Sequence, residues 1–145
     1  MKVVIQRVSE ATCTISSETT ARIEEGLCLF VSFAKGDTEA LLAPMARKIS
    51  HLRIFEDKQG KMNLSVKDIK GEILSISQFT LEANTKKGHR PSFTDALEPK
   101  EAKRLYDTFN AYLADEGCSV QTGSFQEHML ISIQNDGPVT ILLSS

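Results

Sequence analysis

Segments rich in β-forming residues alternate with two stretches of helical periodicity, and this order constrains the fold more than any other feature. The first four β-rich segments are Val3–Val8, Ala11–Ile15, Arg22–Glu24 and Leu27–Ala34. Polar residues or glycine interrupt them, which predicts an N-terminal antiparallel meander. Shorter strands are expected between residues 53 and 83, with a turn at 57–60. Two final strands are expected at 130–133 and 139–143.

The two helical stretches are predicted from their apolar stripes and their boundary residues. Asp37 or Thr38 can cap the first helix, and Pro44 must lie in its first turn or kink it. The second helix begins at Pro99 and stops at Gly117. The stripes consist of Leu41, Leu42, Met45, Ile49 and Leu52 in the first helix, and Leu105, Tyr106, Phe109, Tyr112 and Leu113 in the second. This order of elements predicts an α/β sandwich with helices on one side of mostly antiparallel sheets.

Length and composition fit one compact domain that spans residues 1–145. With 41% hydrophobic residues, such a chain buries most of the surface that its unfolded form exposes. No apolar run approaches the roughly 20 residues needed to cross a bilayer, and Met1–Arg7 is typical of a strand rather than a signal peptide. We therefore expect a cytoplasmic protein. Cys13, Cys28 and Cys118 are odd in number and widely spaced, which favours buried free thiols over a disulfide framework or a zinc site.

The common catalytic motifs are absent from the sequence. It contains no G-x-S-x-G elbow, H-E-x-x-H pair, P-loop or G-x-G-x-x-G loop. His51 is interpreted as a surface or capping residue at the end of the first helix. His128, beside Met129, could line a site, but the interpretation as a residue outside any site is preferred. Thr80 is the candidate nucleophile, but no base that activates it can be named from the sequence.

Two short runs, Ser77–Leu81 and Asn135–Thr140, each lie at an edge of an apolar strand-like stretch. A rigid sheet at such an edge can hold backbone and hydroxyl groups toward a substrate. Together and in this order, the two runs resemble the signatures of the D-aminoacyl-tRNA deacylases. The segments Lys61–Leu64 and Arg90–Phe93 are also similar to that family, so the resemblance covers essentially the whole chain.

This resemblance implies a homodimer with a three-layer β/β/α sandwich and no metal or organic cofactor. It implies hydrolysis of the ester that joins a D-amino acid, or glycine mischarged on a non-cognate tRNA, to the 3′-terminal adenosine of tRNA. Because L-aminoacyl-tRNA must be spared, such an enzyme provides chiral proofreading in translation quality control. Two alternatives remain open, namely a non-catalytic nucleic-acid-binding protein and a generic Thr-dependent esterase.

The resemblance assigns the catalytic role to Ser77, Gln78, Phe79 and Thr80. Backbone N–H groups near Phe79 and Thr80 are expected to polarise the ester carbonyl as an oxyanion hole. Either the Thr80 hydroxyl or the 2′-hydroxyl of the terminal ribose then drives the chemistry, and the second is preferred because no base for Thr80 is evident.

The resemblance also assigns substrate binding and rejection of L-amino acids to the second run. Gly137-Pro138, in the cis form, is expected to enter the active site of the opposite subunit, where its carbonyls receive the substrate ammonium and leave no room for an L side chain. Arg7 is expected to hold this motif across the dimer. Phe125 and Met129 are expected to receive the terminal adenosine. Gln126 stands where a smaller residue is expected.

Net charge limits how such a chain contacts RNA. A formal charge of −2 and a pI near 5.9 argue against a protein that grips a long duplex. A contact restricted to the single-stranded 3′ end depends more on stacking and backbone hydrogen bonds. The densest basic stretch, Lys86–Arg90, either contacts phosphates or is a solvated loop.

Overall fold

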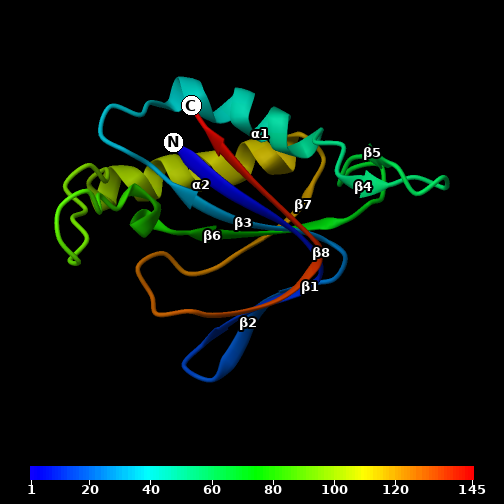
Figure 1. Cartoon of the computed structure of the whole chain (residues 1–145), viewed down its shortest axis with the longest axis horizontal. Coiled ribbons are helices and arrows are strands. Elements are labelled where there is room, and N and C mark those ends of the chain that lie inside the picture. Colours follow the sequence, from blue (N-terminus) through cyan, green and yellow to red (C-terminus); the bar gives the residue numbers. More distant parts are fainter.

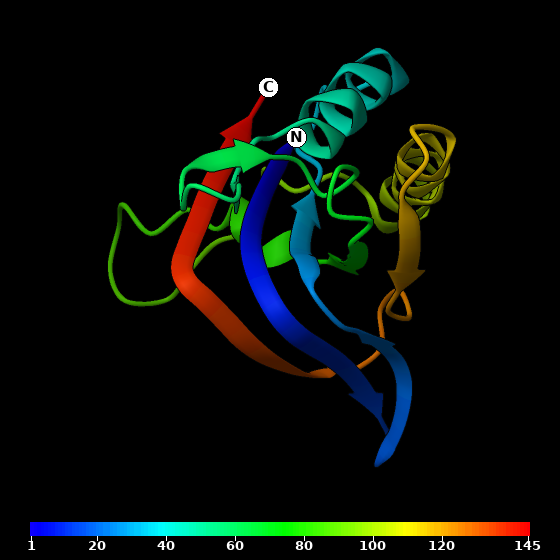
Figure 2. The ribbon, with the colours of Figure 1, turned by 90° about the vertical axis from the view of Figure 1, so that its right-hand side faces the viewer.

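The computed structural model describes all 145 residues and shows a mixed α/β fold, in which two helices cover one face of a bent, mostly antiparallel sheet (Figures 1 and 2). The strands of the main sheet are β1 Lys2–Ile15, β2 Glu18–Ile23, β3 Gly26–Ser32, β6 Glu72–Ser77, β7 Ser119–Thr122 and β8 Leu130–Ser144. A small second sheet contains β4 Phe55–Glu56 and β5 Met62–Leu64. The helices are α1 Leu42–Ser50 and α2 Pro99–Asp115, and the 3-10 turns are η1 Glu39–Leu41 and η2 Phe79–Glu82.

Strand β1 is the centre of the main sheet. It pairs antiparallel with β2 and β3, which follow one another along one edge, and with β8 along the other edge. Beyond β3, the pairs β3–β6 and β6–β7 are parallel. The predicted N-terminal meander is therefore wrong, because Val3–Val8 and Ala11–Ile15 belong to one continuous strand. The polar residues between them do not end β1, since β8 pairs with both halves of it.

Apolar side chains cover both faces of β3 and β6. One core of 20 buried residues lies between the sheet and the two helices and includes Leu29, Ile49 and Phe109. A second cluster of eight lies on the other face, where Cys28 and Leu74 meet residues from the far half of β1 and from β2. The bent end of the sheet thus packs back onto its own central strands, a curvature that Figure 2 shows clearly. All three cysteines are free and buried, as predicted.

The two helices end close to their predicted boundaries. Pro99 begins α2, the Glu98 carboxylate accepts a hydrogen bond from the Glu101 N–H at 3.3 Å, and Gly117 follows the helix with φ +89°. Pro44 lies in the first turn of α1, as predicted. Neither candidate cap of the first helix supplies a side-chain cap, because the turn η1 precedes α1.

Asp37 has a different partner from the one predicted. Its Oδ2 accepts a hydrogen bond from the Ala34 N–H at 2.7 Å and lies 2.5 Å from the N-terminal ammonium. The charge of this side chain therefore ties the chain terminus to the loop after β3. His51 is the C-terminal capping residue of α1 and is exposed, as predicted. None of the helices combines the length and the apolar character that a membrane crossing requires.

Candidate active site

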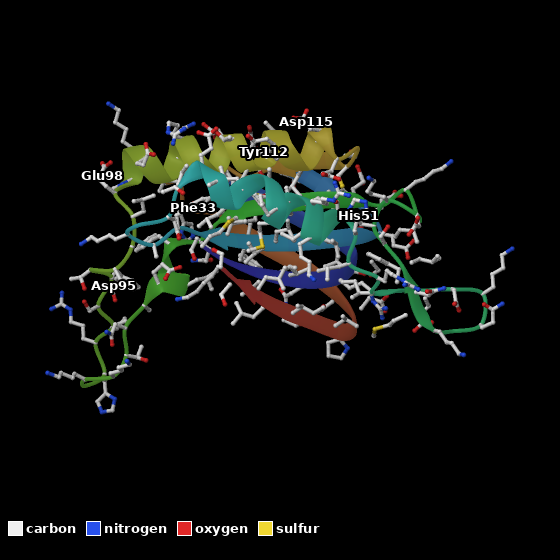
Figure 3. The ribbon with its side chains drawn as sticks, turned by 90° about the horizontal axis from the view of Figure 1, so that it is seen from above. Phe33, His51, Asp95, Glu98, Tyr112 and Asp115 are labelled. Carbon is white, nitrogen blue, oxygen red and sulfur yellow. The ribbon has the colours of Figure 1, made fainter.

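A pocket of about 700 Å³ opens where β3 and β6 end and α2 begins. Aromatic and aliphatic side chains form most of its wall, and the polar groups come mainly from the residues after β6 and from the loop before β8. The lining includes Phe33, Ser77, Gln78, Phe79, Phe93, Glu98, Phe125, Gln126, His128 and Met129. Figure 3 shows Phe33 and Glu98 at the same end of the molecule, away from His51 and Asp115.

The first motif forms one edge of this pocket. β6 ends at Ser77, the Gln78 N–H donates to the Val31 carbonyl at 2.8 Å, and η2 begins at Phe79. The first N–H groups of a helix have no partner within it, so those of Phe79 and Thr80 are available to an external acceptor. Ser77, Gln78 and Phe79 line the pocket, whereas Thr80 lies exposed beside it. The Gln78 amide donates to the Thr80 hydroxyl, and no histidine or carboxylate is hydrogen-bonded to that hydroxyl.

A buried carboxylate fixes the other end of η2. Glu82 accepts hydrogen bonds from the Ser32 hydroxyl at 2.5 Å and from the Lys2 ammonium at 2.8 Å. The same ammonium donates to the Leu81 carbonyl at 3.0 Å. Glu82 is among the few buried charged residues of the chain. This pair of contacts to Glu82 was not predicted, and its only signal in the sequence is a single glutamate directly after the first motif.

Phe125 and Met129 also line the pocket, and they come from the loop between β7 and β8. The Phe125 ring packs 6.2 Å from the Tyr106 ring, and the Tyr106 hydroxyl donates to the Ser75 carbonyl at 2.6 Å. Burial raises the pKa of Tyr106, so this hydroxyl stays a donor at neutral pH. A Cβ atom on Gly123 would lie 2.4 Å from the Met129 sulfur, so a larger residue there would require the Met129 side chain to move.

Two residues of this loop bear on the expectations from the sequence. His128 lines the pocket, so its interpretation as a residue outside any site is wrong. Gln126 has φ +66°, in the left-handed region that favours glycine or asparagine, which agrees with the expectation of a smaller residue there. Phe33 and Phe93 were missed as lining residues. The signal for Phe33 was its position directly after an apolar strand.

The second motif lies inside a strand and not between two strands. β8 runs without interruption from Leu130 to Ser144, so the predicted division into two strands at 130–133 and 139–143 is wrong. Its pairing with β1 passes from Gln6↔Thr140 to Val8↔Asn135, which leaves four residues of β8 opposite Arg7 alone. This is a β-bulge with more than the usual single extra residue. The Gly137–Pro138 bond at its centre is cis, as the resemblance implies.

Arg7 connects the bulge to the rest of the chain. It lies inside β1 rather than at a strand end, and only 5% of it is exposed. Its Nε donates to the Asp136 carbonyl at 3.1 Å and its Nη1 to the buried Ile54 carbonyl at 2.7 Å. Its Nε also lies 3.4 Å from the Asp136 carboxylate. These contacts with the motif are made within one chain.

The predicted site residues therefore form two separate groups. Ser77, Gln78, Phe79, Phe125 and Met129 surround the pocket, with Thr80 at its edge. Arg7, Gly137 and Pro138 lie together at the bulge, and none of them lines the pocket.

Comparisons with known proteins identify the family of this chain. The family model described as D-Tyr-tRNA(Tyr) deacylase matches residues 4–144. The chain belongs to this family. The D-aminoacyl-tRNA deacylase of Thermotoga petrophila is 52% identical over 145 residues, which cover 100% of this chain and 97% of that protein. The D-aminoacyl-tRNA deacylase of Halalkalibacterium halodurans is 50% identical, with coverage of 100% and 99%.

Solved structures show that the deacylase family shares this architecture. A protein described as c-Myc DNA Unwinding Element Binding Protein superposes with a TM-score of 0.93 at 40% identity and covers 100% of this chain and 99% of its own. A probable eukaryotic D-amino acid tRNA deacylase superposes with a TM-score of 0.84 at 16% identity, with coverage of 98% and 97%. The second likeness concerns the fold alone.

Proposed function

We propose that this chain is a hydrolase that cleaves the ester between a D-amino acid, or glycine, and the 3′-terminal adenosine of tRNA. Family membership carries this proposal, and the pocket supports it, because Ser77, Gln78 and Phe79 line the same pocket as Phe125 and Met129. An apolar wall suits an adenine base, and hydrogen-bond donors suit an ester carbonyl. As a single domain of residues 1–145, the protein acts in the cytoplasm, where aminoacyl-tRNA is used.

In this reaction the protein mainly positions the substrate. Water adds to the ester carbonyl carbon, the bond from that carbon to the ribose oxygen breaks, and the ribose oxygen takes up a proton. The N–H groups of Phe79 and Thr80 stabilise the negative charge that develops on the carbonyl oxygen, a role commonly worth about 3 kcal/mol per donor. The adjacent 2′-hydroxyl assists the attack, because the Thr80 hydroxyl contacts an amide and no base.

Chiral selection is assigned to Gly137 and Pro138 from a second subunit. The bulge and the pocket are separate in one chain, so a symmetric dimer is needed to bring the bulge of one protomer to the pocket of its partner. Strand β8 is an edge strand with only β1 as neighbour, and Leu130 and Leu142 on it are each 63% exposed. Burial of such a surface favours association. We include the three-layer β/β/α arrangement in this proposal, with the self-packed bend of the sheet as its second β layer.

The decisive experiment compares D-Tyr-tRNA, Gly-tRNA and L-Tyr-tRNA under identical single-turnover conditions. We expect cleavage of the first two and at least about 10³-fold slower cleavage of the third, which corresponds to roughly 4 kcal/mol of steric exclusion. Equal rates for the D and L substrates would contradict the proposal. A light-scattering mass of one chain, with full activity, would contradict the dimer.

Nucleic-acid binding without catalysis is the second candidate function. The observation that favours it is the 40% identical structure whose description is that of a DNA-unwinding-element-binding protein. The same assay separates the two functions, because tight binding of uncleaved D-Tyr-tRNA would support this candidate alone. A generic Thr-dependent esterase lacks support, since no histidine or carboxylate is hydrogen-bonded to the Thr80 hydroxyl.

A further inference from the structure

Residues 85–91 form a projecting loop, here called the basic finger. It carries Lys86, Lys87, His89 and Arg90, all of which are exposed. None of these four side chains takes part in an ion pair of the chain. Figure 1 shows this loop, in light green, extending from the body of the molecule beside η2. Its cations are therefore free to meet an anionic partner.

The base of the finger is joined directly to the wall of the pocket. Asn84 and Ser92 exchange two backbone hydrogen bonds, of 2.7 Å and 3.0 Å, which close the neck. The next residue, Phe93, packs edge-on against Phe79 with ring centroids 5.2 Å apart. Both rings line the pocket. A ligand that fills the pocket and continues past Phe79 and Phe93 therefore passes the finger.

The charge of the finger contrasts with that of the rest of the chain. Without Lys86, Lys87 and Arg90 the chain would have 14 basic and 19 acidic side chains. Three residues out from the neck reach at most about 10 Å. That distance equals roughly the length of three stacked nucleotides in one strand, at about 3.4 Å per nucleotide. The finger thus matches a short stretch of phosphates next to the pocket and not a long duplex.

We propose that the basic finger binds the phosphates of the single-stranded nucleotides that precede the terminal adenosine in the pocket. This inference rests on the proposed function for the identity of the pocket ligand. The finger contributes affinity for the RNA strand and takes no part in the chemistry at the ester. Its contacts are electrostatic, so they are independent of base sequence and weaken as salt is added.

The test uses a triple variant, Lys86→Ala, Lys87→Ala and Arg90→Ala, in the full chain. Each single-strand phosphate contact contributes about 0.7 to the slope of log affinity against log salt, so three contacts contribute about 2. When the salt concentration is raised from 50 to 200 mM, the KM for D-Tyr-tRNA should increase in both proteins. We expect the factor of increase to be about 20 times larger for the wild type than for the variant. The kcat should stay the same, and so should hydrolysis of D-tyrosyl-adenosine, which has no phosphate.

The matched control removes the same charge elsewhere, by Lys48→Ala, Lys58→Ala and Lys70→Ala. These three lysines are exposed, form no ion pair and do not line the pocket. The control should keep the salt dependence of the wild type. If the finger variant and the control have equal KM values and equal salt slopes while the wild type cleaves D-Tyr-tRNA, the finger is only a solvated loop.

A binding experiment tests the finger without catalysis. It uses a single-stranded RNA that ends in adenosine and carries no amino acid, and fluorescence anisotropy measures its Kd. A Kd that rises in the finger variant and not in the control supports the proposal even if the wild type cleaves no aminoacyl-tRNA. Equal Kd values for all three proteins would overturn it. Failure of the proposed function is recognised separately, as intact D-Tyr-tRNA after incubation with the wild type.

Discussion

Replacement of Arg7 by methionine tests how the bulge is held. Arg7 is buried, and it satisfies the carbonyls of Ile54 at 2.7 Å and of Asp136 at 3.1 Å. A buried carbonyl that loses its donor costs about 1–3 kcal/mol. The Ile54 carbonyl bears this cost in full, whereas Asp136 is exposed and water can replace the lost donor. The Asp136 carboxylate is 54% exposed, so its ion pair adds less than about 1 kcal/mol. We expect a total loss of about 1–4 kcal/mol.

The assay is equilibrium unfolding in urea, together with thermal unfolding at fixed protein concentration. A loss of about 3 kcal/mol corresponds to a Tm that is lower by about 6–12 °C for a chain of this size. Arg22→Met is the matched control, because Arg22 is also on the sheet but its ion pair with Glu10 is solvent-exposed. It should cost less than about 1 kcal/mol. If Arg7→Met unfolds at the same urea concentration as Arg22→Met, the buried hydrogen bond from Arg7 to the Ile54 carbonyl does not stabilise the fold.

Three further predictions concern the first motif, the contacts of Glu82 and the buried thiols. Thr80→Val should slow single-turnover cleavage less than a substrate ending in 2′-deoxyadenosine does; the opposite order would make Thr80 the nucleophile. Glu82→Ala should lower the free energy of unfolding by about 2 kcal/mol, because it leaves the Ser32 hydroxyl without its acceptor, and Glu82→Gln should cost less. Equal urea midpoints for Glu82→Ala and the wild type would refute a stabilising role of the Glu82 contacts. Burial, with a smaller contribution from Cys13, raises the pKa of Cys28 to about 12. As the pH rises, the unfolded chain therefore loses this proton before the folded chain does. Between pH 9 and 12 this group should lower the free energy of unfolding by about 1.4 kcal/mol per pH unit. Urea midpoints at pH 9, 10 and 11 measure the decline, and Cys28→Ala should make it shallower; an identical decline would exclude Cys28 as its source.

The helices and the turn at 57–60 could be predicted because the residues that determine them are neighbours in the sequence. A helical stripe bounded by Pro99 and Gly117 leaves few alternatives, and α2 has these bounds within two residues. The turn at 57–60 is held by the Asp57 carboxylate, which accepts from the N–H groups of Gln59 and Lys61. Such turns depend only on neighbouring residues.

The long strands could not be predicted, because their continuity depends on partners far away in the chain. Ser9 and Glu10 interrupt an apolar alternation, and Asn135–Pro138 has the composition of a turn. In the structure, β1 and β8 pair on both sides of these residues, and bulges absorb the mismatch. The same limit applies to Glu82, whose partners Lys2 and Ser32 lie on other strands. Sequence identifies the residue types of the site, while these distant contacts decide which of them share a pocket.

The separation of the bulge from the pocket leads to a complementation experiment. In Gly137→Ala, a new Cβ would lie 2.9 Å from a Val139 methyl carbon and 3.1 Å from Arg7 Nη2, at a residue with φ +121°, so the bulge must change shape. Gln78→Ala changes the pocket instead.

In a mixed dimer of these two variants, trans action leaves one site with an intact pocket and an intact bulge, because each comes from a different subunit. We expect the mixed dimer to recover up to about half of the wild-type rate with wild-type preference for D over L substrates, whereas each homodimer is defective. If both motifs acted within one chain, every site of the mixed dimer would contain one altered motif. No recovery, in a preparation whose mixed composition is verified by mass, would therefore exclude trans action.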